Sequence, residues 1–167
     1  MHYLKRKKVI SWALYDWANS AFATTVMAGF FPLFFKSFWA ADLSPVESTT
    51  VIGTTNSLAG LFIVLLAPIL GAYSDLGKLK KKFLAFFALL GVLSTGYLYF
   101  IPQGDWIIAA SLYALAVIGF SGGNIFYDSL IVSVSKQDQR NKVSSLGFSV
   151  GYLGGGLLFV INVLMYL

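Results

Sequence analysis

Cysteine is absent from the 167 residues, and the only histidine is His2, next to the N-terminus. The chain therefore contains no disulfide bond. It also has neither the ligands for a Cys/His metal site nor a buried imidazole for catalysis. We expect it to hold no metal and no other cofactor.

Charged side chains are also scarce, since Asp, Glu, Lys and Arg together make up 11% of the chain. Soluble proteins use about 25% of these residues. Apolar residues take their place, with 57% of the chain hydrophobic and a mean hydropathy of +0.76. This composition excludes an ordinary soluble domain and predicts an all-α, polytopic helical membrane protein.

Five apolar stretches are long enough to cross a bilayer as helices, which takes about 20 residues each. We expect transmembrane spans at about residues 10–35, 51–73, 83–101, 106–135 and 143–167. Trp12 and Trp39 flank the first span, as aromatic residues commonly do at membrane interfaces. The second span is preceded by Ser44-Pro45-Val46-Glu47, a pattern typical of a capped helix N-terminus.

Basic residues gather on one side of the predicted membrane. They cluster in residues 5–8, 78–82 and 136–142, whereas Lys36 alone falls in a connection on the other side. This positive-inside pattern predicts a multi-pass protein with a cytoplasmic N-terminus, and we expect a bacterial plasma membrane as its location. Because the charge follows the topology, the net charge of +5 does not indicate a nucleic-acid partner.

Two acidic residues, Asp16 and Asp128, fall inside the predicted spans, with Asn19 and Asn124 within one helical turn of them. An unpaired carboxylate in the membrane costs at least ~2.5 kcal/mol. No Lys or Arg lies inside any span to pair with them. We therefore expect these four residues to line a wet polar cavity that binds a polar solute or a coupling proton. The alternative is that both acids are structural and bond to nearby hydroxyl or backbone groups.

Glycines recur every four residues in the fifth span, at Gly147, Gly151 and Gly155. Such spacing presents a flat helix face, and it predicts close packing against another helix rather than a binding site. The fifth span is still apolar where the sequence stops at Leu167. This end and the odd number of spans lead us to expect a truncated chain.

The connection between the second and third spans, Gly71 to Lys82, reads GAYSDLGKLKKK. It resembles the corresponding loop of the major facilitator superfamily, whose pattern is G-x-x-x-D-x-x-G-R/K-x-R/K. Gly71 and Asp75 match in spacing, whereas Leu76 stands where arginine is frequent and Gly77 comes one position early. Three further stretches resemble the vacuole-effluxer-like branch of that superfamily: WALYDWANSAFATT from Trp12, FYDSL from Phe126 and VSSLGFSVGYLGGGLL from Val143.

This resemblance implies a twelve-span fold in two halves. Residues 1–167 would form a partial N-terminal transmembrane domain, most of the first half, and the C-terminal half would be missing. The implied function is secondary active transport of a small polar solute, with amino acids as one candidate, by alternating access and without enzymatic activity. The resemblance also assigns Gly71 and Asp75 to a gating loop.

Two other function classes remain open at this stage. The dipeptides Tyr15-Asp16 and Tyr127-Asp128 place two acids in the membrane, as in presenilin-like intramembrane aspartyl proteases. The Gly-x-Gly and Pro-Ala-Leu motifs of that family do not accompany them. The second alternative is a small structural or assembly membrane protein whose five spans are complete and oligomerise through the Gly147 face.

Overall fold

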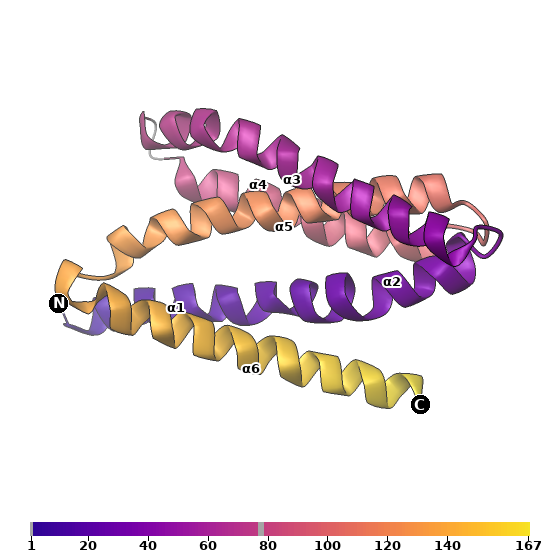
Figure 1. The fold of residues 1–167 in the computed structure, drawn as a ribbon. Helices are drawn as coiled ribbons and strands as arrows, with labels where there is room; N and C mark the ends of the chain where they lie inside the picture. Colours follow the sequence, from indigo (N-terminus) through magenta and orange to yellow (C-terminus); the bar gives the residue numbers. More distant parts are fainter. Residues whose placement is uncertain (1, 77–78) are drawn as a thin grey trace. The chain divides into compact units, whose positions relative to one another are not determined.

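The computed structural model describes residues 2–76 and 79–167, and every regular element in this part of the chain is helical. In chain order the elements are α1 His2–Ala21, η1 Phe22–Phe30, α2 Phe31–Phe34, η2 Phe35–Trp39, α3 Pro45–Leu76, α4 Lys80–Tyr97, η3 Leu98–Phe100, α5 Trp106–Val134, η4 Gln137–Gln139 and α6 Arg140–Tyr166. Figure 1 labels the α-helices.

Within the described residues, five helical stretches are long and apolar enough to cross a membrane. They are Arg6–Trp39, Pro45–Tyr73, Lys80–Phe100, Trp106–Val134 and Gln137–Tyr166. The predicted all-α class with five candidate spans is confirmed. Each stretch covers most or all of the span expected from the sequence. In a membrane a helix satisfies the backbone polar groups of such an apolar run within the run itself.

The first span is not a regular α-helix, which the sequence did not predict. Its turns widen to π-helix in η1 and again in η2, and α2 is a short α-helical segment between them. The backbone N–H of Phe31 donates to the carbonyl oxygen of Val26, and that of Ala40 donates to Phe35 at 2.7 Å. Both bonds reach back five residues instead of four. Such turns are rare, and they are frequent at functional sites.

Helix α3 begins with the predicted cap. The backbone N–H of Ser44 donates to the Glu47 carboxylate at 2.9 Å, and the N–H of Glu47 donates to the Ser44 hydroxyl oxygen at 3.3 Å. Pro45 takes the first helical position, where its missing N–H leaves no bond unmade. This reciprocal capping box explains why the helix starts several residues before the apolar run.

The turn predicted at residues 71–82 is shorter than expected, and this part of the prediction is wrong. Helix α3 continues to Leu76, three residues past the predicted end of the span at 73, and α4 begins at Lys80. Gly71 therefore lies inside the helix, as the span 51–73 predicted, and not in the loop to which the family pattern assigned it. Residues 72–76 contain neither glycine nor proline, so nothing in them ends the helix. Asp75 falls in the last turn of α3, and its side chain lies outside the described part of the structure.

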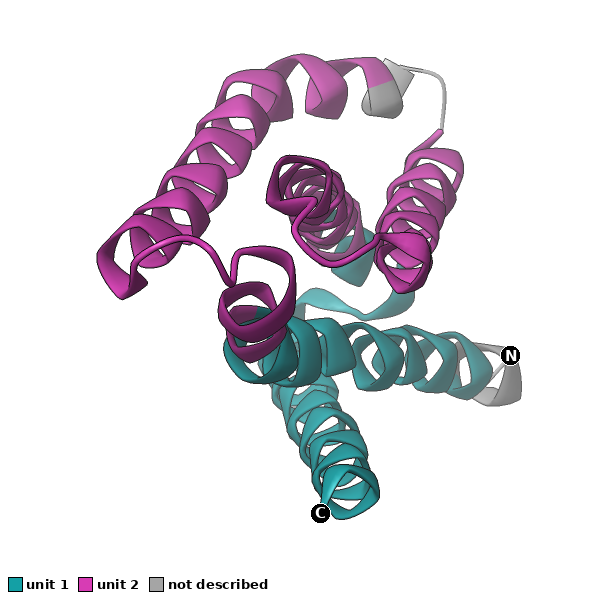
Figure 2. Cartoon of the chain, turned by 90° about the vertical axis from the view of Figure 1, so that its right-hand side faces the viewer, with its two compact units in different colours: residues 1–31, 129–167 teal, residues 32–128 magenta. Residues whose placement is uncertain are grey.

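The chain divides into two units, which are described separately (Figure 2). Unit 1 comprises residues 1–31 and 129–167, and unit 2 comprises residues 32–128. The core of unit 2 joins three helices through the buried side chains of Ile63, Phe87 and Phe126. The Phe126 ring stacks on Phe87 with centroids 5.8 Å apart, and on Phe83 at 5.1 Å. Aromatic stacking therefore holds α4 against α5.

Glycines allow α4 and α5 to cross closely in the same unit. A Cβ atom added to Gly119 of α5 would lie 2.7 Å from the Cα atom of Gly91 on α4. A Cβ atom at Gly122 would meet the ring of Phe87. The crossing thus depends on the absence of side chains at both positions of α5.

The turn between α4 and α5 is tied to the end of η2, also within unit 2. The Trp39 indole N–H donates to the carbonyl oxygen of Ile101 at 3.2 Å, and the backbone N–H of Gly104 donates to Phe38 at 3.3 Å. Gly104 has a φ of 89°, which favours glycine over any residue with a side chain. These bonds anchor the connection between α4 and α5.

Candidate functional site

In unit 1, α1 packs against α6 through glycines. A Cβ atom added to Gly151 would lie 2.8 Å from Oδ2 of Asp16 and 2.7 Å from Oγ of Ser20. One added to Gly155 would lie 2.9 Å from Oγ1 of Thr24. Polar side chains of the first span therefore rest directly on the backbone of α6, a packing that only glycine permits.

Asp16, Ser20 and Thr24 recur every four residues and form one polar stripe along this contact. The Ser20 hydroxyl donates to Oδ1 of Asp16 at 3.3 Å. The Thr24 hydroxyl lies 3.1 Å from the carbonyl oxygen of Ser20 and also 3.1 Å from that of Gly155. The stripe thus links the half-buried carboxylate of Asp16 to the α6 backbone. Sequence analysis did not predict this packing contact, although the four-residue spacing of Asp16, Ser20 and Thr24 was visible.

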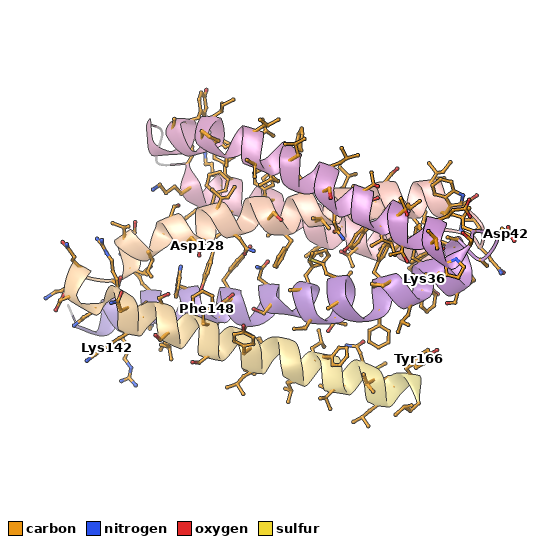
Figure 3. All side chains as sticks on the ribbon, viewed as in Figure 1. Lys36, Asp42, Asp128, Lys142, Phe148 and Tyr166 are labelled. Carbon is orange, nitrogen blue, oxygen red and sulfur yellow. The ribbon has the colours of Figure 1, made fainter. Side chains whose placement is uncertain are left out.

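Aromatic side chains make the contacts between the first span and α6 farther from Asp16. The Phe30 ring lies 6.3 Å from the ring of Phe159 and 6.1 Å from that of Tyr166, between ring centroids. A Cβ atom at Gly29 would lie 2.7 Å from the Phe159 ring. Figure 3 shows Tyr166 close to the C-terminal end of α6 and Phe148 nearer its start. The first span and α6 are therefore in contact from Asp16 to Phe30.

The second pair of predicted site residues lies on α5. Asn124 is half-buried and Asp128 is exposed, and their spacing of four places them on one helix face. Figure 3 labels Asp128 in the half of α5 that leads to the η4 turn. Asp16 and half-buried Asn19 belong to unit 1, whereas Asn124 and Asp128 belong to unit 2. A cavity wall shared by all four residues therefore stays a prediction.

Thr25, next to Thr24, differs from it in its hydrogen bonding. Its side chain is 9% exposed, and its hydroxyl oxygen is buried without a hydrogen-bond partner among the described residues. It lies in the π-helical segment η1. Nothing in the sequence distinguishes Thr25 from Thr24, so only the structure identifies it.

The predicted gate is described only in part. Gly71 is half-buried in α3, and a Cβ atom added to it would meet nothing within 4 Å. Close packing therefore does not explain glycine at this position. The role of Gly71 and Asp75 in gating stays a prediction.

Comparison with known proteins adds evidence from outside the chain. Residues 4–132 match the protein family described as vacuole effluxer Atg22 like. The chain is 42% identical over 162 residues to YxiO of Bacillus subtilis (strain 168), named an uncharacterized MFS-type transporter, where MFS denotes the major facilitator superfamily. The matched region is 96% of this chain and 38% of YxiO.

A second relative is an uncharacterized protein of Aquifex aeolicus (strain VF5). It is 30% identical over 159 residues, which cover 93% of this chain and 38% of the relative. The chain thus spans 38% of the length of each of these proteins. No solved structure matches it.

The family match begins before the first apolar helix and ends inside the last turns of α5, so it covers well over half of the chain. Its extent agrees with the stretches that carried the resemblance in the first and fourth spans. The five apolar helices agree with a multi-pass membrane protein. The chain belongs to the vacuole effluxer Atg22-like family.

Proposed function

We propose that the chain is the N-terminal part of a secondary active transporter of the major facilitator type, which moves a small polar solute across a membrane. The observation that carries the proposal is the 42% identity to the MFS-type transporter YxiO over 96% of this chain. Because the chain spans 38% of that relative, transport is the activity of the longer protein, to which these residues contribute.

Asp16 and Asn19 on α1, with Asn124 and Asp128 on α5, are the proposed polar lining of the transport path. An acidic residue within a membrane span is by default functional, since its charge must be paired, protonated or wetted. Asp16 is half-buried, and the Ser20 hydroxyl is one of its partners. In this role Asp16 binds a coupling proton or a cationic group of the solute. Amino acids, which carry such a group, are one candidate solute class.

Alternating access requires two bodies that move against each other. In this proposal, the close contacts of Gly151 and Gly155 with α1 make the first span and α6 move as one body, with Gly147 extending the same face. Gly71 and Asp75 act at the gate, and a C-terminal half supplies the second body. The N-terminus is cytoplasmic, and the membrane is a bacterial plasma membrane, in keeping with the origin of the two relatives.

The two alternative functions receive no support from the comparisons. The family description names an effluxer, and the named relative is a transporter. Neither names a protease or an assembly protein. We therefore propose transport without catalysis, and we assign Asp16 and Asp128 no proteolytic role.

A chimera tests the proposal. Residues 1–167 replace the matched 38% of YxiO, and vesicles carrying either YxiO or the chimera are assayed for uptake of labelled amino acids and other small polar solutes. Each uptake is measured with and without a proton gradient. We expect the chimera to accumulate the solute that YxiO accumulates. Correct insertion of the chimera without any uptake of that solute would contradict the proposal.

A further inference from the structure

Thr25 lies near the middle of the apolar stretch Arg6–Trp39, at a depth where lipid offers a polar group no hydrogen-bond partner. Its side chain is 9% exposed, and its hydroxyl has no hydrogen-bond partner among the residues that the structure describes. A buried hydroxyl left in this state costs about 1–3 kcal/mol. A residue with this cost calls for a physical explanation.

Many other hydroxyl side chains avoid the cost within their own helix. They donate to the carbonyl oxygen four residues earlier, as is common for Ser and Thr in helices. The single hydroxyl proton of Thr24 lies within hydrogen-bonding distance of this acceptor, at Ser20, and of the carbonyl oxygen of Gly155. For Thr25 the corresponding acceptor is the carbonyl oxygen of Ala21, and no such bond is made. The hydroxyls that do make it include Ser37, Ser48, Thr49, Thr50, Ser57, Thr95, Ser111, Ser135 and Ser149.

We propose that the Thr25 hydroxyl is a solute-binding group, which donates a hydrogen bond to a carbonyl or carboxylate oxygen of the transported solute. This inference rests on the proposed transport function and deepens it. Because the Thr25 hydroxyl makes no hydrogen bond within the described residues, its donor is available to an incoming oxygen atom. The free-energy cost of the unpartnered hydroxyl then disappears when solute is bound, which favours binding at this point of the span.

Thr25 and Asp16 serve different tasks in this proposal. Nine residues separate them, which corresponds to roughly 13 Å along a helix axis. A solute of amino-acid size does not span that distance. Thr25 therefore contacts the solute near the middle of the span, and Asp16 is left to bind the coupling proton.

The neighbouring threonines provide a matched pair of variants. In the 167-residue chain in detergent, Thr24→Val removes a bonded hydroxyl and is expected to lower the midpoint of thermal unfolding. Thr25→Val removes a hydroxyl without a partner, so the midpoint of thermal unfolding of this variant is expected to equal or exceed that of the parent chain. If Thr25→Val lowers the midpoint as much as Thr24→Val, the Thr25 hydroxyl is bonded inside the protein and the inference is overturned.

The chimera with YxiO tests solute contact directly. Thr25→Val is expected to raise KM about tenfold, as for one lost hydrogen bond, whereas Thr25→Ser keeps the hydroxyl and stays near the parent value. Thr24→Val is expected to leave KM unchanged. An unchanged KM for Thr25→Val overturns this inference and leaves the transport function standing. An inserted parent chimera that does not take up the solute of YxiO overturns both.

A third measurement needs no knowledge of the solute. The chain has no cysteine, so Thr25→Cys and Thr24→Cys each introduce the only thiol in these 167 residues. In chimera-containing membranes, a small methanethiosulfonate reagent is expected to modify Thr25→Cys faster than Thr24→Cys. In this proposal water and small solutes reach position 25 along the transport path, whereas position 24 is packed against α6. Equal protection of both thiols would mean that Thr25 lies in a dry contact, and this too overturns the inference.

Discussion

The Thr24 hydroxyl donates a hydrogen bond to the backbone carbonyl oxygen of Gly155, 3.1 Å away and 131 residues later in the chain. The bond joins the first span to α6 at a glycine, where a Cβ atom would lie 2.9 Å from the Thr24 hydroxyl oxygen. Helices in a membrane gain little from burying apolar surface against each other, because lipid is equally apolar. Close backbone contact and interhelical hydrogen bonds such as this one hold the pair together.

Gly155→Ala is therefore expected to destabilise unit 1. The new Cβ atom would lie 2.9 Å from Oγ1 of Thr24 and 3.0 Å from the backbone oxygen of Ser20. Overpacking of this kind costs about 1–3 kcal/mol. The next residue is the control, since a Cβ atom at Gly156 meets nothing within 4 Å. Thermal unfolding in detergent should show a lower midpoint for Gly155→Ala only, and equal midpoints would contradict the packing described.

Unit 2 offers a parallel test at the crossing of α4 and α5. Gly119→Ala would bring a Cβ atom to 2.7 Å from the Cα atom of Gly91. The Cα atom of Gly91 is part of the backbone, and the new Cβ atom is fixed to the backbone of α5, so neither atom can move without shifting a helix. We expect the variant to lose about 2 kcal/mol or more of its free energy of unfolding. Gly60→Ala on α3 meets nothing within 4 Å and serves as the control. A Gly119→Ala variant as stable as Gly60→Ala would show that the helices are not this close.

The capping box of α3 predicts coupled effects of two substitutions. Ser44→Ala and Glu47→Ala each remove one of the two reciprocal bonds; Ser44→Ala should cost about 1 kcal/mol, and Glu47→Ala should also lower the stability. The double variant should cost less than the sum of both, since the two residues act as one unit. Urea unfolding of the four proteins measures this difference. Fully additive costs would mean that the two residues cap independently.

Asp16→Asn tests the proposed transport site in the YxiO chimera. The variant keeps the size and much of the hydrogen bonding of the side chain but cannot carry the negative charge. Uptake should fall by about tenfold or more and lose its response to a proton gradient, while insertion stays intact. Asp42→Asn, at an exposed position in the turn before α3, is the control. Unchanged uptake and an unchanged gradient response would reduce Asp16 to a structural residue.

The proposed orientation in the membrane is tested with single cysteines. Gln103 lies in the exposed turn before α5, and Gln137 lies in the exposed η4 turn after it. With a cytoplasmic N-terminus, a membrane-impermeant thiol reagent should label Gln103→Cys in intact cells. Gln137→Cys should react only after the cells are permeabilised. The opposite pattern would place the N-terminus outside.

Sequence reasoning predicted the helices well, and it predicted the contacts between them only in part. Hydropathy located all five apolar helices, and the Ser44 to Glu47 pattern located a helix start, because both depend on neighbouring residues. The connection after the second span was predicted to begin too early, at Gly71, whereas α3 continues to Leu76, because a family pattern was read as a loop where the residues favour continued helix. The π-helical turns of η1 and η2 left no mark in the sequence.

By itself, the sequence determined that this is an all-helical membrane protein, and it singled out Asp16 as an acid that needs a reason to lie in a span. Only the tertiary structure decided that Asp16, Ser20 and Thr24 pack against Gly151 and Gly155. It also decided that the Thr25 hydroxyl, unlike that of Thr24, has no hydrogen-bond partner among the described residues. The reason is physical. Helix formation follows from local composition and from the surrounding lipid, whereas a contact such as Thr24 with Gly155 exists only once distant segments have packed.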